Sequence, residues 1–513
     1  MFVRKNKNRS GSVSVQIISK ETGRYRVVET IGSGKTQEEI ATLCLEAQIR
    51  LHQIQFPHQS SLFVYPDELH IKTFIENLSN RQVHTIGPEL IFGTLFDKIG
   101  FNTIKDKLFR HIVIARLAYP ASKLKTVDYL YRYRGIKMGV TDVYRFLDRL
   151  NKKYKPGVER IAYKYTKNTL KGNITVVFYD MTTLYFEAED EDDLRKIGFS
   201  KDGKFQKPQI MLGLLVGKEG LPIGYDIFRG NTFEGHTLMP TLKKIQQKYG
   251  FSQPIVVADA ALLSKDNLRH LDKARYRFII GARIKNENDK IKQKMLIQSQ
   301  DMKDGDSFII KKKDKTRLVV TYSDKRATKD ALNRRRGLKK LRAKIRTGKL
   351  TKNHINNRGY NKFLSLKGEL TVKIDEIRIE EDRQWDGLKG YITNTRLRAK
   401  TIVKNYSHLW QIEKAFRISK TDLKVRPIFH QRQRRIEAHI CIAFVSYTIY
   451  KELELLLRKG NANMSPKRVG ELTHNMYEIE FVLPKSRKKE GIILKLDEEQ
   501  KLLRDIVEKY AKS

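Results

Sequence analysis

The chain has 513 residues, of which 40% are hydrophobic, so it is long enough for more than one compact unit with a real core. Lysine and arginine number 102 against 58 acids, and the net charge of +44 predicts a polyanionic partner: nucleic acid first, an anionic membrane surface second. No apolar run approaches the ~20 residues that cross a bilayer, and the N-terminal residues do not resemble a secretory signal. Two cysteines exclude a disulfide framework or a cysteine zinc site and suit a reducing compartment. We therefore expect a cytoplasmic, nucleoid-associated protein with no membrane contact.

Residues 1–80 are expected to form a β-hairpin followed by a helix. The segments 12–19 and 24–31 alternate apolar and polar residues across a turn. The following GSGKT is typical of a P-loop, but Glu29 stands where a P-loop needs a further glycine. Thr36 and the glutamate three residues later form a capping box instead, which predicts a helix start. The module is either a DNA contact or an appendage.

Residues 85–170 have apolar residues at three- and four-residue spacing, interrupted by prolines and a glycine. This pattern predicts a helical region, and its basic character favours DNA binding. Tyrosine and arginine alternate in 130–134, which fits either a stripe that follows phosphates or packed tyrosines beside solvated arginines.

Residues 171–284 change to the pattern of an α/β sheet. A long β-branched and aromatic strand contains Asp180, and two further strands follow at 209–217 and 221–228. After a helix, another strand ends at Asp259, and a further helix and strand complete the segment. Three antiparallel strands followed by alternating helices and strands predict a mixed sheet.

Residues 285–395 interrupt this rhythm with further strands and many basic residues. The part at 321–352 has 13 Lys or Arg against two aspartates and contains a basic helix, which is either a place for DNA to lie or a solvated insertion helix. Residues 396–460 return to helices, the last of them strongly apolar and expected to pack under the sheet. Residues 461–513 form a basic tail that ends in a helix.

The stretch YSHLWQIEKAFRISKTDLK predicts one long amphipathic helix. At about 100° per residue, Tyr406, Glu413, Arg417, Lys420 and Lys424 fall within a narrow arc beside an apolar flank. That row suits a phosphate backbone together with a metal ion. An ordinary amphipathic helix with a solvated charged face is the alternative.

Three carboxylates are candidates for catalysis: Asp180 within a strand, Asp259 at a strand end, and Glu413 on the later helix. A charge within an apolar strand is costly unless it is compensated, and a divalent cation would compensate it. Mg²⁺ prefers oxygen ligands, and two ions about 4 Å apart clamp the attacking and leaving oxygens of phosphoryl transfer. A hydrogen-bonded strand-end carboxylate remains the alternative for either aspartate.

The segments around these carboxylates, YDMTTLYFE, VVADAALLS and YSHLWQIEKAFRISK, resemble the DDE transposases of bacterial insertion sequences. The last segment is similar to the signature Y-x2-R-x3-E-x6-K of the insertion-sequence-four superfamily. Tyr406, Glu413 and Lys420 have this spacing, whereas Leu409 stands at the arginine position. With leucine at this position, the segment resembles the branch of the superfamily whose transposases carry LW.IE..F in this helix.

This resemblance implies a ribonuclease-H-like mixed sheet, formed by 171–284 and 396–460 and interrupted by a mainly β insertion at 285–395. It implies that Asp180, Asp259 and Glu413 hold two Mg²⁺ ions, with Mn²⁺ as a substitute. The implied activity is hydrolysis at the terminal inverted repeats of double-stranded transposon DNA, through a hairpin, followed by joining of the 3′-hydroxyl to target DNA. A homodimer on paired ends is implied as well.

The resemblance also implies DNA contacts around a flipped base. Tyr406 and Lys420 would hold phosphates near that base, and Arg417 would replace the missing arginine of the signature. An aromatic residue of the insertion would stack on the base, with Trp385 and Tyr391 as candidates and a core position as the alternative for each.

Two other functions stay open. A ribonuclease-H-like nuclease or resolvase would cut DNA without strand transfer, and a repurposed transposase would bind DNA without catalysis. An RNA-binding protein ranks lower because the chain lacks aromatic RNP-type motifs.

Overall fold

The computed structural model divides the chain into two compact units. Unit 1 comprises Met1–Thr94, Ser122–Val140 and Gly460–Ser513, and unit 2 comprises Leu95–Ala121 and Thr141–Lys459. The residues that the structure describes are 1–8, 10–20, 23–55, 75–76, 78–250, 253–347, 355–356, 359–367, 371–482 and 488–511. The end of the predicted basic segment, 348–352, lies outside them. The predicted helical region 85–170 contributes to both units, and its proposed boundaries stay predictions.

Unit 1 contains the N-terminal module as an antiparallel sheet, β1–β2–β3, with one helix packed on it. The elements are β1 (Phe2–Lys7), β2 (Val13–Ser19), β3 (Arg26–Gly34) and α1 (Gln37–Gln55). Thr36 accepts a hydrogen bond from the Glu39 N–H at 3.2 Å, and Glu39 accepts one from the Thr36 N–H at 3.2 Å. The predicted hairpin, helix and capping box are therefore confirmed, and β1 adds a third strand.

The rest of unit 1 joins segments from distant parts of the chain. Strand β15 pairs antiparallel with both β4 and β16, with Tyr477 opposite Thr85. The tail ends in a helix, as the sequence predicts. The elements are β4 (Val83–Thr85), α5 (Lys123–Arg134), α16 (Pro466–His474), β15 (Tyr477–Val482), β16 (Lys489–Ile493) and α17 (Glu498–Ala511).

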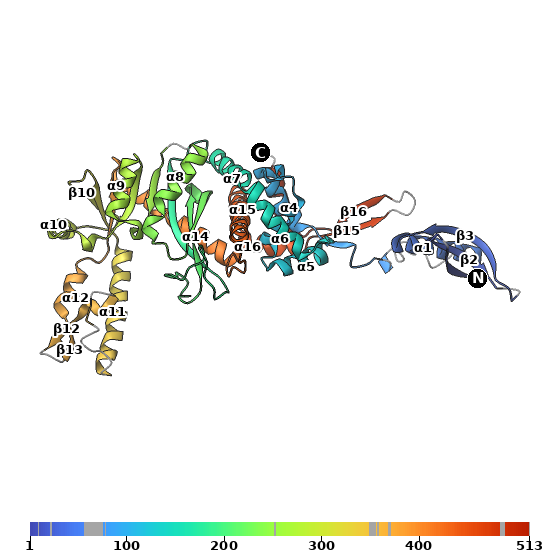
Figure 1. The fold of residues 1–513 in the computed structure, drawn as a ribbon, viewed down its shortest axis with the longest axis horizontal. Coiled ribbons are helices and arrows are strands. Elements are labelled where there is room, and N and C mark those ends of the chain that lie inside the picture. Colours follow the sequence, from blue (N-terminus) through green and yellow to red (C-terminus); the bar gives the residue numbers. More distant parts are fainter. Residues whose placement is uncertain are drawn as a thin grey trace. The chain divides into compact units, whose positions relative to one another are not determined.

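Unit 2 is built on one eight-stranded mixed sheet of order β10-β11-β14-β9-β8-β5-β6-β7 (Figure 1). Strands β5, β8 and β9 run parallel, and every other pairing is antiparallel. Parallel and antiparallel pairings occur in one sheet, and helices connect several of its strands, so the predicted mixed α/β class is confirmed. The strands are β5 (Val176–Tyr185), β6 (Gln209–Val216), β7 (Pro222–Arg229), β8 (Ile255–Ala258), β9 (Arg277–Ala282), β10 (Ser307–Lys311), β11 (Arg317–Tyr322) and β14 (Leu388–Thr393).

Helices cover both faces of this sheet, and the side chains of β5 alternate between them. Tyr179 and Met181 join the core that α8 and α9 complete on one face. Thr182 and Leu184 line a small apolar cavity that α14 and α15 close on the other. The helices around the sheet include α7 (Lys155–Thr169), α8 (Leu238–Tyr249), α9 (Lys265–Lys273), α14 (Trp410–Arg417) and α15 (Gln433–Lys459).

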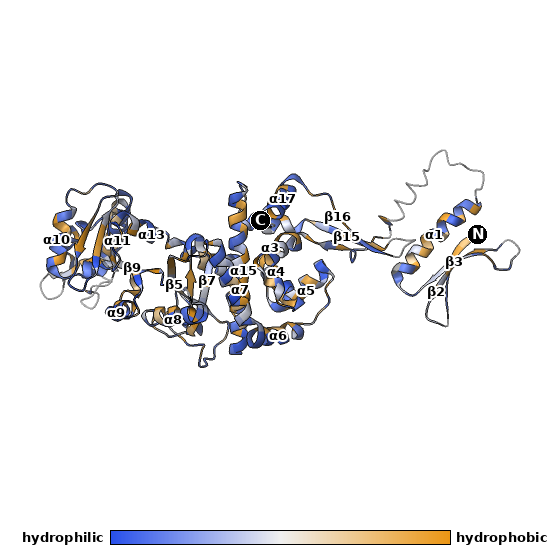
Figure 2. Ribbon diagram, turned by 90° about the horizontal axis from the view of Figure 1, so that it is seen from above, coloured by the Kyte–Doolittle hydropathy of each residue, from blue (hydrophilic) through white to orange (hydrophobic). Residues whose placement is uncertain are grey.

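In the main sheet of unit 2, apolar residues concentrate on strands such as β5, as Figure 2 shows. Helix α15 packs against the sheet as predicted: the ring of Phe444 lies 4.9 Å from that of Tyr225 on β7. Of the helices that the structure describes, none is both long and apolar enough to span a bilayer.

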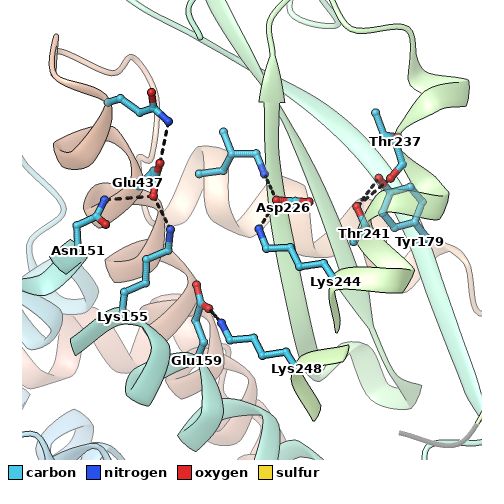
Figure 3. A network of polar contacts seen from close by, with 12 residues as sticks. Asn151, Lys155, Glu159, Tyr179, Asp226, Thr237, Thr241, Lys244, Lys248 and Glu437 are labelled. Atoms are coloured by element: carbon cyan, nitrogen blue, oxygen red, sulfur yellow. Dashed lines mark hydrogen bonds and ion pairs between the residues drawn. The ribbon is translucent and has the colours of Figure 1, made fainter. Parts of the chain in front are cut away.

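Ion pairs connect the helices at the edge of unit 2 (Figure 3). Lys155 at the start of α7 bonds Glu437 of α15 at 2.7 Å. Glu159, one turn further along α7, pairs with Lys248 of α8. These contacts fix helices from both faces of the sheet to one another and so hold β5 and its neighbours in a defined frame.

The segment 285–395 differs from the predicted mainly β insertion. Strands β10, β11 and β14 extend the main sheet, whereas the β12–β13 hairpin packs with α11 around a separate core of Leu341, Phe363, Leu364 and Val372. Three helices contribute more residues than the strands do, because the charged stretches have helical apolar spacing. The additional elements are α10 (Asp289–Ser299), α11 (Asp324–Arg346), β12 (Leu364–Lys367), β13 (Thr371–Ile374) and α12 (Glu376–Arg383).

Candidate active site

Asp180 lies in the middle of β5, opposite Leu214 of β6. Its side chain is 23% exposed, and its Oδ1 accepts the Met181 N–H at 2.7 Å. Burial raises the pKa of Asp180 from 3.8 to about 6, and the positive charge of Lys201 opposes this rise. The protein therefore keeps an acidic group at a position where ionisation is unfavourable, which is typical of functional sites.

Lys201 approaches Asp180 from the long connection between β5 and β6. Its Nζ lies 3.8 Å from Asp180 Oδ1 and 2.7 Å from Glu234, and it donates to the Met181 carbonyl at 2.7 Å. Its backbone N–H donates to Thr183 Oγ1 at 3.0 Å. Sequence reasoning missed Lys201 and Glu234, because neither residue has a fixed spacing from Asp180 and only the fold brings them together.

Asp259 follows directly on β8, which lies beside β5 and runs parallel to it. Tyr179 pairs with Ala258, so Asp180, within β5, and Asp259, directly after β8, lie at the same level of the two neighbouring strands. The charge of Asp259 contributes to the raised pKa of Asp180. The sheet register alone thus brings together two residues that are distant in sequence.

Tyr406 connects Asp259 to the helical side of the site. Its hydroxyl donates to Asp259 Oδ1 at 3.0 Å, and burial together with the Asp259 charge raises the pKa of this phenol. A Cβ on Gly281 of β9 would lie 2.6 Å from the Tyr406 hydroxyl, so only glycine leaves room for this approach. The ring of Tyr391 lies 4.7 Å from the Tyr406 ring, and Lys389 Nζ lies 4.5 Å from its centroid.

Glu413 is exposed on α14, and its charge acts on Lys389 and Tyr406, the residues beside Asp259. The carboxylates of Asp259 and Glu413 both favour the charged form of Lys389, whose pKa burial lowers. Glu413 also contributes, after Asp259 and Tyr391, to the raised pKa of Tyr406. The charges of Asp180, Asp259 and Glu413 therefore reach one continuous set of side chains.

The predicted single helix from 406 to 424 is wrong. Tyr406 lies in α13 (Ala399–Ser407), Glu413 in α14, and Lys420 in a π-helical turn at Ile418–Asp422. The break occurs at Leu409, whose side chain is only 7% exposed and packs into the core. Because the segment is divided into separate helices, the simple helical arc does not describe the row.

The remaining predicted DNA contacts lie at different places. Lys420 is 11% exposed and lies 3.1 Å from both carboxylate oxygens of Asp202, which also pairs with Arg426 at 3.3 Å. Burial lowers the pKa of Lys420, and Asp202 opposes this. Arg417 is exposed at the end of α14. Lys424 follows the π-helical turn in a left-handed conformation.

The two candidate aromatic residues of the insertion differ in position. Tyr391 is buried against Tyr406 and so lies at the carboxylate site. Trp385 is half-buried against the main core and lines a hollow with Lys285 and Lys362. The structure thus brings Tyr391, and not Trp385, to the predicted catalytic residues.

The three candidate carboxylates supply oxygen ligands, which suit a hard cation such as Mg²⁺. Within the described parts of the chain, no three His, Cys, Asp or Glu side chains are close enough to hold an ion together. The residues therefore fit a magnesium site by ligand type, and Asp180 and Asp259 also by their place on neighbouring strands.

Comparisons with solved structures give transposases. A piggyBac transposase synaptic complex with hairpin DNA is similar over 78% of this chain and 80% of that chain, at 10% identity and a TM-score of 0.38. A Mos1 transposase paired-end complex with the left transposon end matches over 47% and 77%, at 9% identity and a TM-score of 0.16. A Mos1 mariner paired-end complex with Mn matches over 48% and 77%, at 10% identity and a TM-score of 0.14.

A comparison with curated protein sequences gives no match. A profile of the transposase DDE domain family matches residues 171–449, which is more than half of the chain and includes all three candidate carboxylates. The chain therefore belongs to the transposase DDE domain family.

Proposed function

We propose that the protein binds the ends of a transposable element, cleaves them by metal-dependent phosphodiester hydrolysis and joins the 3′-hydroxyl to target DNA. One observation carries this proposal: Asp180 within β5 and Asp259 directly after the parallel strand β8 lie at the same level, and the charges of Asp259 and Glu413 both act on Tyr406 and Lys389. Family membership supplies the substrate class. The superfamily signature with its leucine variant, the hairpin intermediate and a homodimer on paired ends belong to this proposal.

Asp180, Asp259 and Glu413 would hold two Mg²⁺ ions, with Mn²⁺ as a substitute. Bound metal supplies Lewis acidity at the scissile phosphate and favours deprotonation of the attacking water or 3′-hydroxyl. Lys201 partly neutralises Asp180, and Tyr406 orients Asp259 through its hydroxyl. Because this phenol is protonated and already donates to Asp259, Tyr406 is a positioning residue and no covalent protein–DNA intermediate is required.

Four residues are proposed DNA contacts: Tyr406, Lys420, Arg417 and Trp385. Lys420 could contact DNA only by giving up a bond that it already makes, because its ammonium group donates to Asp202. A DNA phosphate would compete with that carboxylate for the same cation. Arg417 is exposed and available for a phosphate without such an exchange.

The test uses the full-length protein and a labelled duplex that contains the DNA flanking its reading frame. With Mg²⁺ we expect a specific nick at the element end and joined products when a target plasmid is added. Asp259→Asn and Glu413→Gln should each lose cleavage yet bind the duplex with wild-type affinity. Cleavage without joined products would support the nuclease alternative, and wild-type cleavage by either variant would remove that carboxylate from the site.

A further inference from the structure

Helix α11 carries a dense stripe of positive charge. Ten of its Lys and Arg residues are exposed over 23 residues, against one exposed acid, Asp324. Only Arg326 and Arg342 lie within ion-pair distance of a carboxylate, at 3.6 and 3.5 Å; the other eight have no such partner among the residues that the structure describes. Their mutual repulsion is therefore left uncompensated by the protein itself.

The charge lies on one side because the opposite side is packed. Arg334, Gly337 and Leu341 are buried, and Gly337 lies so close to the Tyr360 ring that a Cβ would be 2.4 Å from it. At about 100° per residue, the exposed cations centre on the arc opposite these three residues. The helix thus presents an ordered cationic face, with its back fixed to the small core of the insertion (Figure 1).

The strand that leads into α11 is connected to the candidate active site. Thr321, three residues before the helix, pairs with Lys389 of β14, and the Ser323 N–H donates to the Gly387 carbonyl at 3.0 Å. Lys389 Nζ lies over the ring of Tyr406, which bonds Asp259. A connected set of contacts therefore leads from the basic helix to the carboxylates.

We propose that α11 binds the phosphate backbone of the duplex DNA whose end enters the carboxylate site, an inference that rests on the proposed function. A helix of 23 residues is about 34 Å long, which corresponds to about 10 base pairs of B-DNA. Helix α11 contains no aromatic residue. Since sequence-independent binding of single strands relies on base stacking as well as charge, its composition favours paired DNA.

The experiment measures binding of the full-length protein, in an Asp259→Asn background that prevents cleavage, to a 40-base-pair duplex of arbitrary sequence. Anisotropy titrations between about 50 and 300 mM KCl give the dependence of log K on log [KCl]. The variant is Arg336→Glu with Lys340→Glu, one turn apart on the cationic face. The control is Lys243→Glu with Lys294→Glu, exposed lysines of α8 and α10, which makes the same charge change elsewhere. Glutamate favours helix, so both variants should fold.

We expect the α11 variant to lower the magnitude of the salt slope by about 2, one unit for each lost phosphate contact, and the control to leave it within error. An unchanged slope, an equal change in the control, or a change seen with single-stranded RNA but not with duplex DNA would overturn the assignment. Cleavage by the wild-type protein, in which both Asp259 and α11 are unchanged, is measured in parallel. Cleavage by the wild-type protein together with an unchanged slope in the α11 variant rejects only the role of α11. A reduced slope in the α11 variant together with no cleavage by the wild-type protein rejects only the proposed chemistry.

Discussion

Replacement of Asp180 by asparagine should stabilise the protein in the absence of metal. Asparagine has nearly the same shape, keeps an oxygen for the Met181 N–H, and removes a carboxylate that is costly to ionise at this position. Burial raises the pKa of Asp180 from 3.8 to about 6. A shift of this size corresponds to about 3 kcal/mol of destabilisation when the group is ionised. Lys201 keeps its 2.7 Å contact with Glu234, so the substitution leaves no unpaired lysine.

The pH dependence follows from the sign of the shift. The folded-state pKa lies above the unfolded value, so the folded protein binds more protons between these values and loses stability as pH rises through them. Below about pH 4, the group is protonated in both states and the variant gains nothing. The advantage of Asp180→Asn should be about 1.5 kcal/mol at pH 5 and about 3 kcal/mol at pH 8.

Urea denaturation in EDTA at pH 5 and pH 8 measures this difference through the transition midpoints. The control is Asp226→Asn on the neighbouring β7, where the carboxylate is 14% exposed and bonds Lys244 at 2.5 Å (Figure 3). Loss of that ion pair should lower stability. If Asp180→Asn destabilises the protein at pH 8, or if its gain is the same at both pH values, the reasoning about a strained carboxylate fails.

Three further predictions concern the surrounding residues. Gly281→Ala should displace the Tyr406 hydroxyl from Asp259, cost about 1–3 kcal/mol and greatly reduce cleavage, whereas Gly470→Ala, where a Cβ meets nothing within 4 Å, should be neutral or stabilising in the same assays. Tyr406→Phe should reduce cleavage while the metal-free protein keeps wild-type stability to within about 1 kcal/mol; full activity would show that the hydroxyl does not orient Asp259. Lys420→Ala should weaken processing of the excision intermediate in a gel assay, and normal accumulation and resolution of intermediates would count against its phosphate contact.

Much of the sheet was predictable because its signals are local. The apolar strands around Asp180 and Asp259 and the helices between them gave the mixed α/β class. The strongly apolar helix 435–460 was expected under the sheet and is α15. The proximity of the two aspartates follows once the strands are parallel neighbours, which the alternation of helices and strands indicates.

The helix that carries Glu413 shows where periodicity fails. An ideal helical arc assumes one straight helix, but the segment is divided into α13, which ends at Ser407, and α14, which begins at Trp410. The ammonium group of Lys420 donates to the carboxylate of Asp202, which lies in a loop more than two hundred residues earlier. Contacts of this kind depend on how loops fold back on the sheet, and no local pattern encodes them.

The insertion was misjudged for a related reason. The sequence predicts its strands correctly, but the pairing of β14 with β9 depends on long-range hydrogen bonds, such as those that place Tyr391 opposite Gly281. As a result, Tyr391 lies beside Tyr406, and Trp385 lies elsewhere.

The central claim is that three distant carboxylates form one metal site. Anomalous diffraction from crystals of the protein grown with Mn²⁺ and an element-end duplex tests it most directly. Manganese peaks should lie about 2.0–2.3 Å from oxygens of Asp180, Asp259 and Glu413 together. Peaks bound by other residues, or a DNA complex in which Glu413 stays far from both aspartates, would contradict the account.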